Sequence, residues 1–191
     1  MNQLVRFGII LALICFAATL VLAVTYEITK PKIDAELKRE EDEALKTIIP
    51  DADSFKEKSI EGIKYFEALK RNDLIGYCIR VTGSGYNGYI RMLVGVDKDG
   101  IIKGIRILEQ YETPGLGAKI VEIKRGETEP YFLKQFVGKS AKTVEIKKDI
   151  DAITGATISS EAVTDAVREA VNEFLEKIKG STRAQEHMST R

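Results

Sequence analysis

A hydroxyl-rich turn is the part of this chain best suited to chemistry. Residues 154–160 read Thr-Gly-Ala-Thr-Ile-Ser-Ser, and an amphipathic stretch follows them, so they are predicted to open a helix. Free backbone N–H groups and the positive end of a helix dipole make such a turn a site for phosphate, and Gly155 and Ala156 keep its backbone approachable. Four hydroxyls lie within these seven positions: Thr154, Thr157, Ser159 and Ser160. The plainer interpretation is that these hydroxyls only cap the helix.

A glycine-rich segment, residues 112–117, is the second candidate. It reads Glu-Thr-Pro-Gly-Leu-Gly, and residues such as Gly115 allow backbone to approach a flat ring closely. Leu116 can cover one face of a ring, while Glu112 and Thr113 can hydrogen-bond its polar edge. Taken alone, the same residues also fit an ordinary turn.

The chain lacks the residues that most catalytic chemistry needs. Its two cysteines, Cys15 and Cys78, lie far apart in the sequence, which excludes a disulfide framework and a cluster held by four thiolates. The single histidine, His187, falls in a polar C-terminal stretch, so no metal site and no histidine general base are predicted. With 29 basic and 29 acidic residues the net charge is zero, and nothing indicates nucleic acid. These absences remove most hydrolase chemistry and most transition-metal chemistry, and we predict no catalytic residue.

One motif has to be set aside. Residues 83–88 match the G-x-G-x-x-G pattern of dinucleotide-binding proteins, which must be followed by a helix. Residues 89–94 are instead rich in β-branched and aromatic types, so we interpret the match as a hairpin loop. Tyr86 and Tyr89 beside this loop can stack on a ring, although tyrosines in a sheet are more often packing residues.

The N-terminus predicts a membrane anchor. Residues 7–26 are twenty uncharged, mostly apolar residues, which as a helix span about 30 Å, the thickness of a bilayer core. A cleaved signal peptide is the alternative, but its apolar region is usually shorter. Basic residues after the span, such as Lys30 and Lys32, place the following domain in the cytoplasm if the positive-inside rule is applied literally.

The remaining elements predict an α+β protein. Residues 32–49 are expected to form a solvated stalk helix, with Pro31 beginning a new helix or kinking the first. Short runs rich in Ile, Val and Tyr predict an antiparallel meander, with a hairpin at Asp99-Gly100: residues 63–70, 74–81, 89–96 and 101–108.

After the meander we expect short helical pieces at residues 118–124 and 131–137 and a strand at residues 143–147. An amphipathic helix with apolar positions from Ala162 to Ile178 is capped by Ser159 or Ser160. The predicted domains are an anchor at residues 1–29, a stalk at 30–50, a folded domain at 51–180 and a polar tail at 181–191.

The sequence of the turn resembles a known signature. Thr154-Gly155-Ala156-Thr157, after Asp151, is similar to the flavinylation motif of FMN-binding domains. The resemblance implies that a flavin transferase joins the phosphate of FMN covalently to the Thr157 hydroxyl, as a phosphoester. It also implies that residues 112–117 lie against the isoalloxazine ring. Lys139, Lys142 or Lys147 is then expected to neutralise the phosphate or the reduced flavin, and the sequence does not choose among them.

Over the whole length, the chain is similar to the G subunit of the Rnf electron transport complex. The motifs at residues 85–90, 94–97, 112–117 and 153–160 occur in the family order, behind the same kind of anchor. The resemblance implies an electron-transfer protein of the inner membrane, with iron–sulfur and flavin subunits as partners and its domain on the outer face, against the charge count. The alternatives are the C subunit of a Na⁺-translocating NADH:quinone reductase, an anchored flavin donor to a separate reductase, and a flavin-free scaffold.

Overall fold

The computed structural model describes residues 3–189 of the chain, and the side chains of Leu4 and of residues 181–189 fall outside that description. The chain forms two compact units, Met1–Asp42 and Glu43–Arg191. The first unit is helical throughout its described part, and the second unit contains the sheet, the remaining helices and the candidate site.

The first helix, α1 (Gln3–Ile48), is longer than either helix expected for this region. It is continuous through Pro31, so Pro31 does not begin a new helix. Its apolar stretch leaves large side chains exposed, with Phe7 64% and Leu22 71% accessible. By length and composition α1 is long and apolar enough to cross a membrane.

The last turns of α1 belong to the second unit. Ala44, Leu45, Ile48 and Ile49 are all buried there, although this part was expected to be a solvated stalk. They pack against Phe66 and against Cys78, which is fully buried. Burial raises the pKa of the Cys78 thiol to about 12, so this cysteine behaves as a small apolar core residue.

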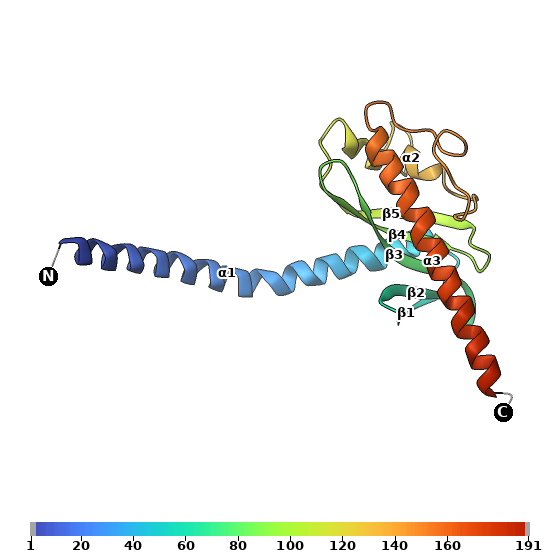
Figure 1. Ribbon diagram of the computed structural model, residues 1–191, viewed down its shortest axis with the longest axis horizontal. Coiled ribbons are helices and arrows are strands. Elements are labelled where there is room, and N and C mark those ends of the chain that lie inside the picture. The colour runs from blue at the N-terminus through green and yellow to red at the C-terminus, as the bar shows by residue number, and fades with distance from the viewer. Residues whose placement is uncertain (1–2, 190–191) are drawn as a thin grey trace. The chain divides into compact units, whose positions relative to one another are not determined.

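Five strands form one antiparallel meander in the order β1-β2-β3-β4-β5 (Figure 1). They are β1 (Ser54–Ile60), β2 (Ile63–Lys70), β3 (Asp73–Ser84), β4 (Tyr89–Val96) and β5 (Ile102–Gln110). The four predicted strands are confirmed, and β1 was missed. β1 lies at the edge of the sheet and exposes most of its side chains, so its sequence carries no apolar alternation.

The sheet is covered on both faces, which explains its continuous apolar runs. In β4, Met92 and Val94 point into the main core, whereas Leu93 between them points to the smaller cluster beneath the end of α1. The main core lies under α3 (Thr157–Ser189), which crosses the sheet in Figure 1 and contacts β3. Val163, Val167 and Phe174 supply fully buried side chains from α3.

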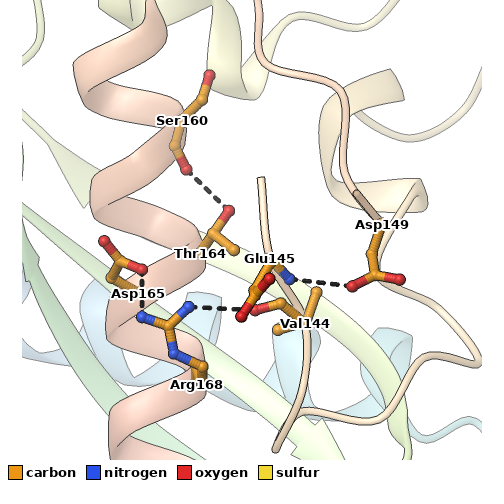
Figure 2. Close-up of polar contacts among 7 residues, drawn as sticks. All are labelled: Val144, Glu145, Asp149, Ser160, Thr164, Asp165 and Arg168. Carbon is orange, nitrogen blue, oxygen red and sulfur yellow. Dashed lines mark hydrogen bonds and ion pairs between the residues drawn. The ribbon is translucent and has the colours of Figure 1, made fainter. Parts of the chain in front are cut away.

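The segment between β5 and α3 contains two short helices, η1 (Gly117–Val121) and α2 (Tyr131–Lys134), which confirm the two predicted helical pieces. The strand predicted at residues 143–147 is wrong. Val144 is buried there, but Lys147 has a φ of +68° and the Asp149 carboxylate accepts a hydrogen bond from the Glu145 N–H, so the chain turns instead of pairing. Arg168 of α3 donates to the Val144 carbonyl and holds this turn against the helix (Figure 2).

The backbone of α3 continues to Ser189 and therefore runs through most of the predicted polar tail. The side chains of that tail, including His187, lie outside the described residues.

Candidate functional site

A pocket of about 340 Å³ lies at the N-terminus of α3. Its volume is within the range of small-molecule sites, about 300–1,000 Å³. Three segments that are distant in the sequence form its walls, namely the β3–β4 loop, the segment after β5 and the turn that leads into α3. The lining residues are Tyr86, Glu112, Thr113, Leu116, Gly117, Gly155, Ala156, Thr157, Ile158 and Ser159.

The turn before α3 delivers the backbone of the helix to the pocket. Gly155 has a φ of +80°, a conformation that favours glycine, and the Ala156 carbonyl accepts the first helical hydrogen bond, from the Ser160 N–H at 2.9 Å. The first helical residue is therefore Thr157. Since the first N–H groups of a helix have no intrahelical acceptor, this turn presents donors and a positive dipole end to an anion.

The predicted helix cap is wrong, because α3 begins earlier than expected. Ser159 and Ser160 lie inside its first turn instead of preceding it. The Ser160 hydroxyl donates to the Ala156 carbonyl at 2.9 Å and accepts from the Ile153 N–H at 3.1 Å, which ties the turn to the helix.

The four hydroxyls of the turn have different environments. Ser159 and Ser160 are buried and hydrogen-bonded. Thr154 is exposed but does not line the pocket. Thr157 is exposed and lines the pocket, and no hydrogen bond among the described residues engages its hydroxyl. Of the four, Thr157 alone offers a free hydroxyl inside the pocket.

Glu112 joins the three walls. The residue is only 5% exposed, and its two carboxylate oxygens accept hydrogen bonds from the Ser159 hydroxyl at 2.5 Å and from the Asn87 N–H at 3.1 Å. The backbone N–H of Glu112 donates to the Gln110 side chain at 2.7 Å. One carboxylate thus fixes the β3–β4 loop and the first turn of α3 to the segment after β5.

Two glycines make room for this carboxylate. A Cβ at Gly85 would collide with Glu112 Oε1, and a Cβ at Gly117 would collide with Glu112 Oε2. Gly85 belongs to the rejected G-x-G-x-x-G match, and the chain continues from that loop into β4, which confirms the hairpin interpretation. Its glycine serves a close approach to a side chain rather than to a nucleotide.

Apolar side chains stand at the rim of the pocket. Tyr86 is 72% exposed, Ile158 53% and Leu116 51%. Leu116 also packs over the turn, because a Cβ at Gly155 would lie 3.6 Å from its Cδ2. Large apolar residues left open around a pocket favour a ligand with an apolar body.

The structure brings most of the predicted site together. Of the nine predicted residues, seven line the pocket, and Thr154 and Gly115 do not. Glu112 and Ser159 are present, but they bond to each other rather than pointing free hydrogen-bonding groups into the pocket. Ile158 is a lining residue that was not predicted, because the exposed side of the first turn depends on where the helix starts.

The predicted lysines do not line this pocket. Lys142 lies beside Gly100 and Leu175, and Leu175 is about 27 Å along α3 from Thr157 at 1.5 Å per residue. Lys139 and Lys147 are likewise absent from the lining residues.

Tyr89 packs against Tyr111 with ring centroids 5.1 Å apart, so only Tyr86 of the two predicted stacking residues reaches the pocket.

Two family models match the chain. Residues 1–48 match the RnfG N-terminal region, and residues 85–172 match the FMN-binding domain. The second match contains every residue that lines the pocket.

Curated relatives match most of the chain. It is 34% identical to the G subunit of the proton-translocating ferredoxin:NAD(+) oxidoreductase complex of Clostridium ljungdahlii, over 85% of this chain and 87% of the relative. It is 32% identical to the G subunit of the Na(+)-translocating ferredoxin:NAD(+) oxidoreductase complex of Acetobacterium woodii, over 88% and 90%. The crystal structure of Shewanella oneidensis NqrC aligns with a TM-score of 0.48 and 24% identity, over 62% of this chain and 61% of that one. The chain belongs to the family formed by the G subunits of ion-translocating oxidoreductase complexes.

Proposed function

We propose that this chain carries FMN as a phosphoester on Thr157 and relays electrons as the G subunit of a membrane-bound, ion-translocating ferredoxin:NAD oxidoreductase complex. The observation that carries the proposal is the position of Thr157, the one free hydroxyl of its turn inside the pocket, at the positive end of α3. The matches to the FMN-binding domain and to the G subunits of such complexes support it.

The residues of the pocket fit this cofactor. The open N–H groups of the first turn of α3 suit a phosphate, and Tyr86, Leu116 and Ile158 suit the two faces of a flat ring. Bound FMN supplies the redox chemistry, which explains why the described residues need no acid–base pair at the pocket. The chain binds and orients the ring and sets its exposure.

Attachment is a group transfer that leaves the oxidation states unchanged. The Thr157 hydroxyl oxygen forms a bond to the phosphorus of a flavin dinucleotide donor, and the bond from that phosphorus to the bridging oxygen breaks. The leaving nucleoside monophosphate takes the hydroxyl proton. A flavin transferase catalyses this step, because Glu112, the one carboxylate among the lining residues, bonds to Ser159 and Asn87 and not to Thr157.

The helix α1 anchors the chain in the inner membrane as a single span, and the FMN-binding domain lies on the outer face. Iron–sulfur and flavin subunits of the complex are the electron donors and acceptors, since no cluster-forming set of cysteines exists in this sequence. The length and composition of α1 support the anchor.

In-gel flavin fluorescence after denaturation tests the attachment. The wild-type chain, co-expressed with the flavin transferase, is compared with Thr157→Ala, Thr157→Ser and the control Thr143→Ala, which alters an exposed threonine away from the pocket. Wild type, Thr157→Ser and Thr143→Ala are expected to fluoresce, and Thr157→Ala is expected to be dark. Equal fluorescence in Thr157→Ala and wild type contradicts the proposal.

Protease treatment of right-side-out vesicles tests the orientation. Lys32, Lys38 and Arg39 are exposed in the part of α1 that follows the apolar span, so trypsin can reach them if this part faces outward. Cleavage there in sealed vesicles is expected. Protection that disappears only when the vesicles are opened places the domain inside.

A further inference from the structure

We propose that Glu112 determines which hydroxyl receives the flavin, by withdrawing Ser159 from the reaction. This inference rests on the proposed attachment to Thr157. Glu112 acts as a positioning residue through Ser159 and does not touch the reacting atoms.

The competition between hydroxyls is built into the pocket. Ser159 lines the same cavity as Thr157 and lies only two positions further along the first turn of α3. Its primary hydroxyl is less hindered than the secondary hydroxyl of a threonine, so chemistry alone favours Ser159 as a phosphate acceptor. The structure has to exclude it.

Burial and the contact with Glu112 shield Ser159 from a donor phosphate. Its hydroxyl donates to Glu112 at 2.5 Å, a short and charge-assisted bond, and the serine is only 2% exposed. Glu112 is itself held in place by the Asn87 N–H at 3.1 Å, and the glycines at positions 85 and 117 let the backbone close tightly around its carboxylate. Because Ser159 is buried against this fixed carboxylate, a donor phosphate can reach its oxygen only if Glu112 moves.

Charge adds a second barrier. The Glu112 carboxylate stands beside Ser159, and a phosphate brought to that hydroxyl would place like charges in contact at a buried position. No carboxylate bonds to Thr157 among the described residues, and the helix dipole at that point favours an anion.

The other hydroxyls of the turn before α3 are excluded by different means. Ser160 is fully buried and bonded to backbone on both sides, and Thr154 lies outside the pocket. Only the exclusion of Ser159 depends on a single side chain, so it can be tested by substitution.

Site mapping in a chain without the normal acceptor tests the inference. Thr157→Ala, Thr157→Ala/Glu112→Ala and Thr157→Ala/Glu112→Gln are co-expressed with the flavin transferase in the full-length chain, and tryptic peptides are analysed for FMN by mass spectrometry. Thr157→Ala/Glu109→Gln is the matched control, because Glu109 lies on β5 and pairs with Arg91 away from the pocket. Thermal unfolding confirms that each variant is folded.

The expected result is no flavin on Thr157→Ala or on the Glu109 control, and a flavin-bearing Ser159 peptide in the Glu112 double variants. Glu112→Ala removes the charge and both acceptor oxygens and should give more labelled peptide than Glu112→Gln, which removes the charge and one acceptor oxygen but keeps the size of the side chain. If the alanine variant does not fold, the glutamine variant decides. Folded double variants without flavin on Ser159, or flavin on Ser159 in Thr157→Ala alone, overturn the inference. A wild-type chain without flavin contradicts the proposed function instead.

Discussion

The sheet and the pocket at the N-terminus of α3 differ in which kinds of side chain are buried. In the sheet and its two cores, apolar side chains such as Ile79 and Phe174 are fully buried and the charged ones face outward. In the pocket, Glu112 and Ser159 are buried while Tyr86, Leu116 and Ile158 are open. The buried polar side chains of the described region all belong to this end of the fold, either in the first two turns of α3 or bonded to them: Glu112, Ser159, Ser160 and Thr164.

This difference in burial separates the residues that stabilise the fold from those that are available to a ligand. A buried polar group is stabilising only when it is hydrogen-bonded, and each of the four is. Their network is therefore a rigid frame, and the exposed apolar rim is the part left for a cofactor. The following predictions compare the two regions, from the largest expected effect to the smallest.

The largest effect is expected in the main core. Phe174 is fully buried, and its ring lies 4.8 Å from that of Tyr65 and 5.1 Å from that of Tyr77, centroid to centroid. Phe174→Ala should lower the free energy of unfolding by about 3–5 kcal/mol, because it leaves a cavity at a crowded position. Urea denaturation of the detergent-solubilised protein measures this. A loss below about 1 kcal/mol would show that α3 is not held by this contact.

An intermediate effect is expected at the frame of the pocket. Glu112→Ala leaves the buried Ser159 hydroxyl and the Asn87 N–H without their acceptor, which should cost about 1–3 kcal/mol. The same denaturation experiment applies, and hydrogen exchange of the Asn87 amide should become faster. An unchanged exchange rate would mean that Glu112 does not hold the β3–β4 loop.

A smaller and pH-dependent effect is expected at Asp97, in the hairpin between β4 and β5. Partial burial opposes ionisation of this carboxyl, but hydrogen bonds from the Ile101 and Asp99 N–H groups and from Lys103 outweigh it and hold its pKa below the ordinary 3.8. A lowered folded-state pKa stabilises the protein above the unfolded-state pKa, and this stability disappears as the pH falls through the folded-state pKa. Asp97→Ala should therefore cost about 1 kcal/mol near pH 7.

The difference between wild type and Asp97→Ala should shrink as the pH falls below about 4, because the wild-type carboxyl then takes up a proton. Denaturation curves of both proteins between about pH 7 and pH 3 measure it, and effects common to both cancel. A difference that stays constant or grows in acid contradicts the assigned role of the carboxylate.

The smallest effect on stability is expected at the rim. Leu116 is 51% exposed, so Leu116→Ala should change the free energy of unfolding by less than about 0.5 kcal/mol. If the rim serves the cofactor, the same variant should alter the flavin absorption spectrum of the loaded protein. A large loss of stability with an unchanged spectrum would make Leu116 a core residue.

Much of the fold followed from local patterns in the sequence. The bounds predicted for β2 and β4 match the structure, because buried strands with clear turn residues on both sides leave little freedom. The missed strand β1 and the false strand at residues 143–147 share a cause. Pairing is decided by neighbours: β1 pairs with β2 despite its polar sequence, whereas Val144 and its neighbours have no strand to pair with.

The segments that form the site could be predicted, but the hydrogen bonds between them could not. Composition made the turn before α3 and the segment at residues 112–117 candidates, and the resemblance to FMN-binding domains selected them as the site. The bond between Glu112 and Ser159 joins residues 47 positions apart, and its existence depends on how the segment after β5 lies against the first turn of α3. Glu112 was therefore predicted to contact a ligand, whereas in the structure it holds the walls of the pocket together.

The most direct test of the central claim is mass mapping of the wild-type chain after co-expression with its flavin transferase. We predict that the peptide containing Thr157 is heavier by the mass of FMN minus one water and that fragmentation places the group on the Thr157 side chain. An unmodified Thr157 peptide from a fully folded chain, or FMN on a different residue, would contradict the account.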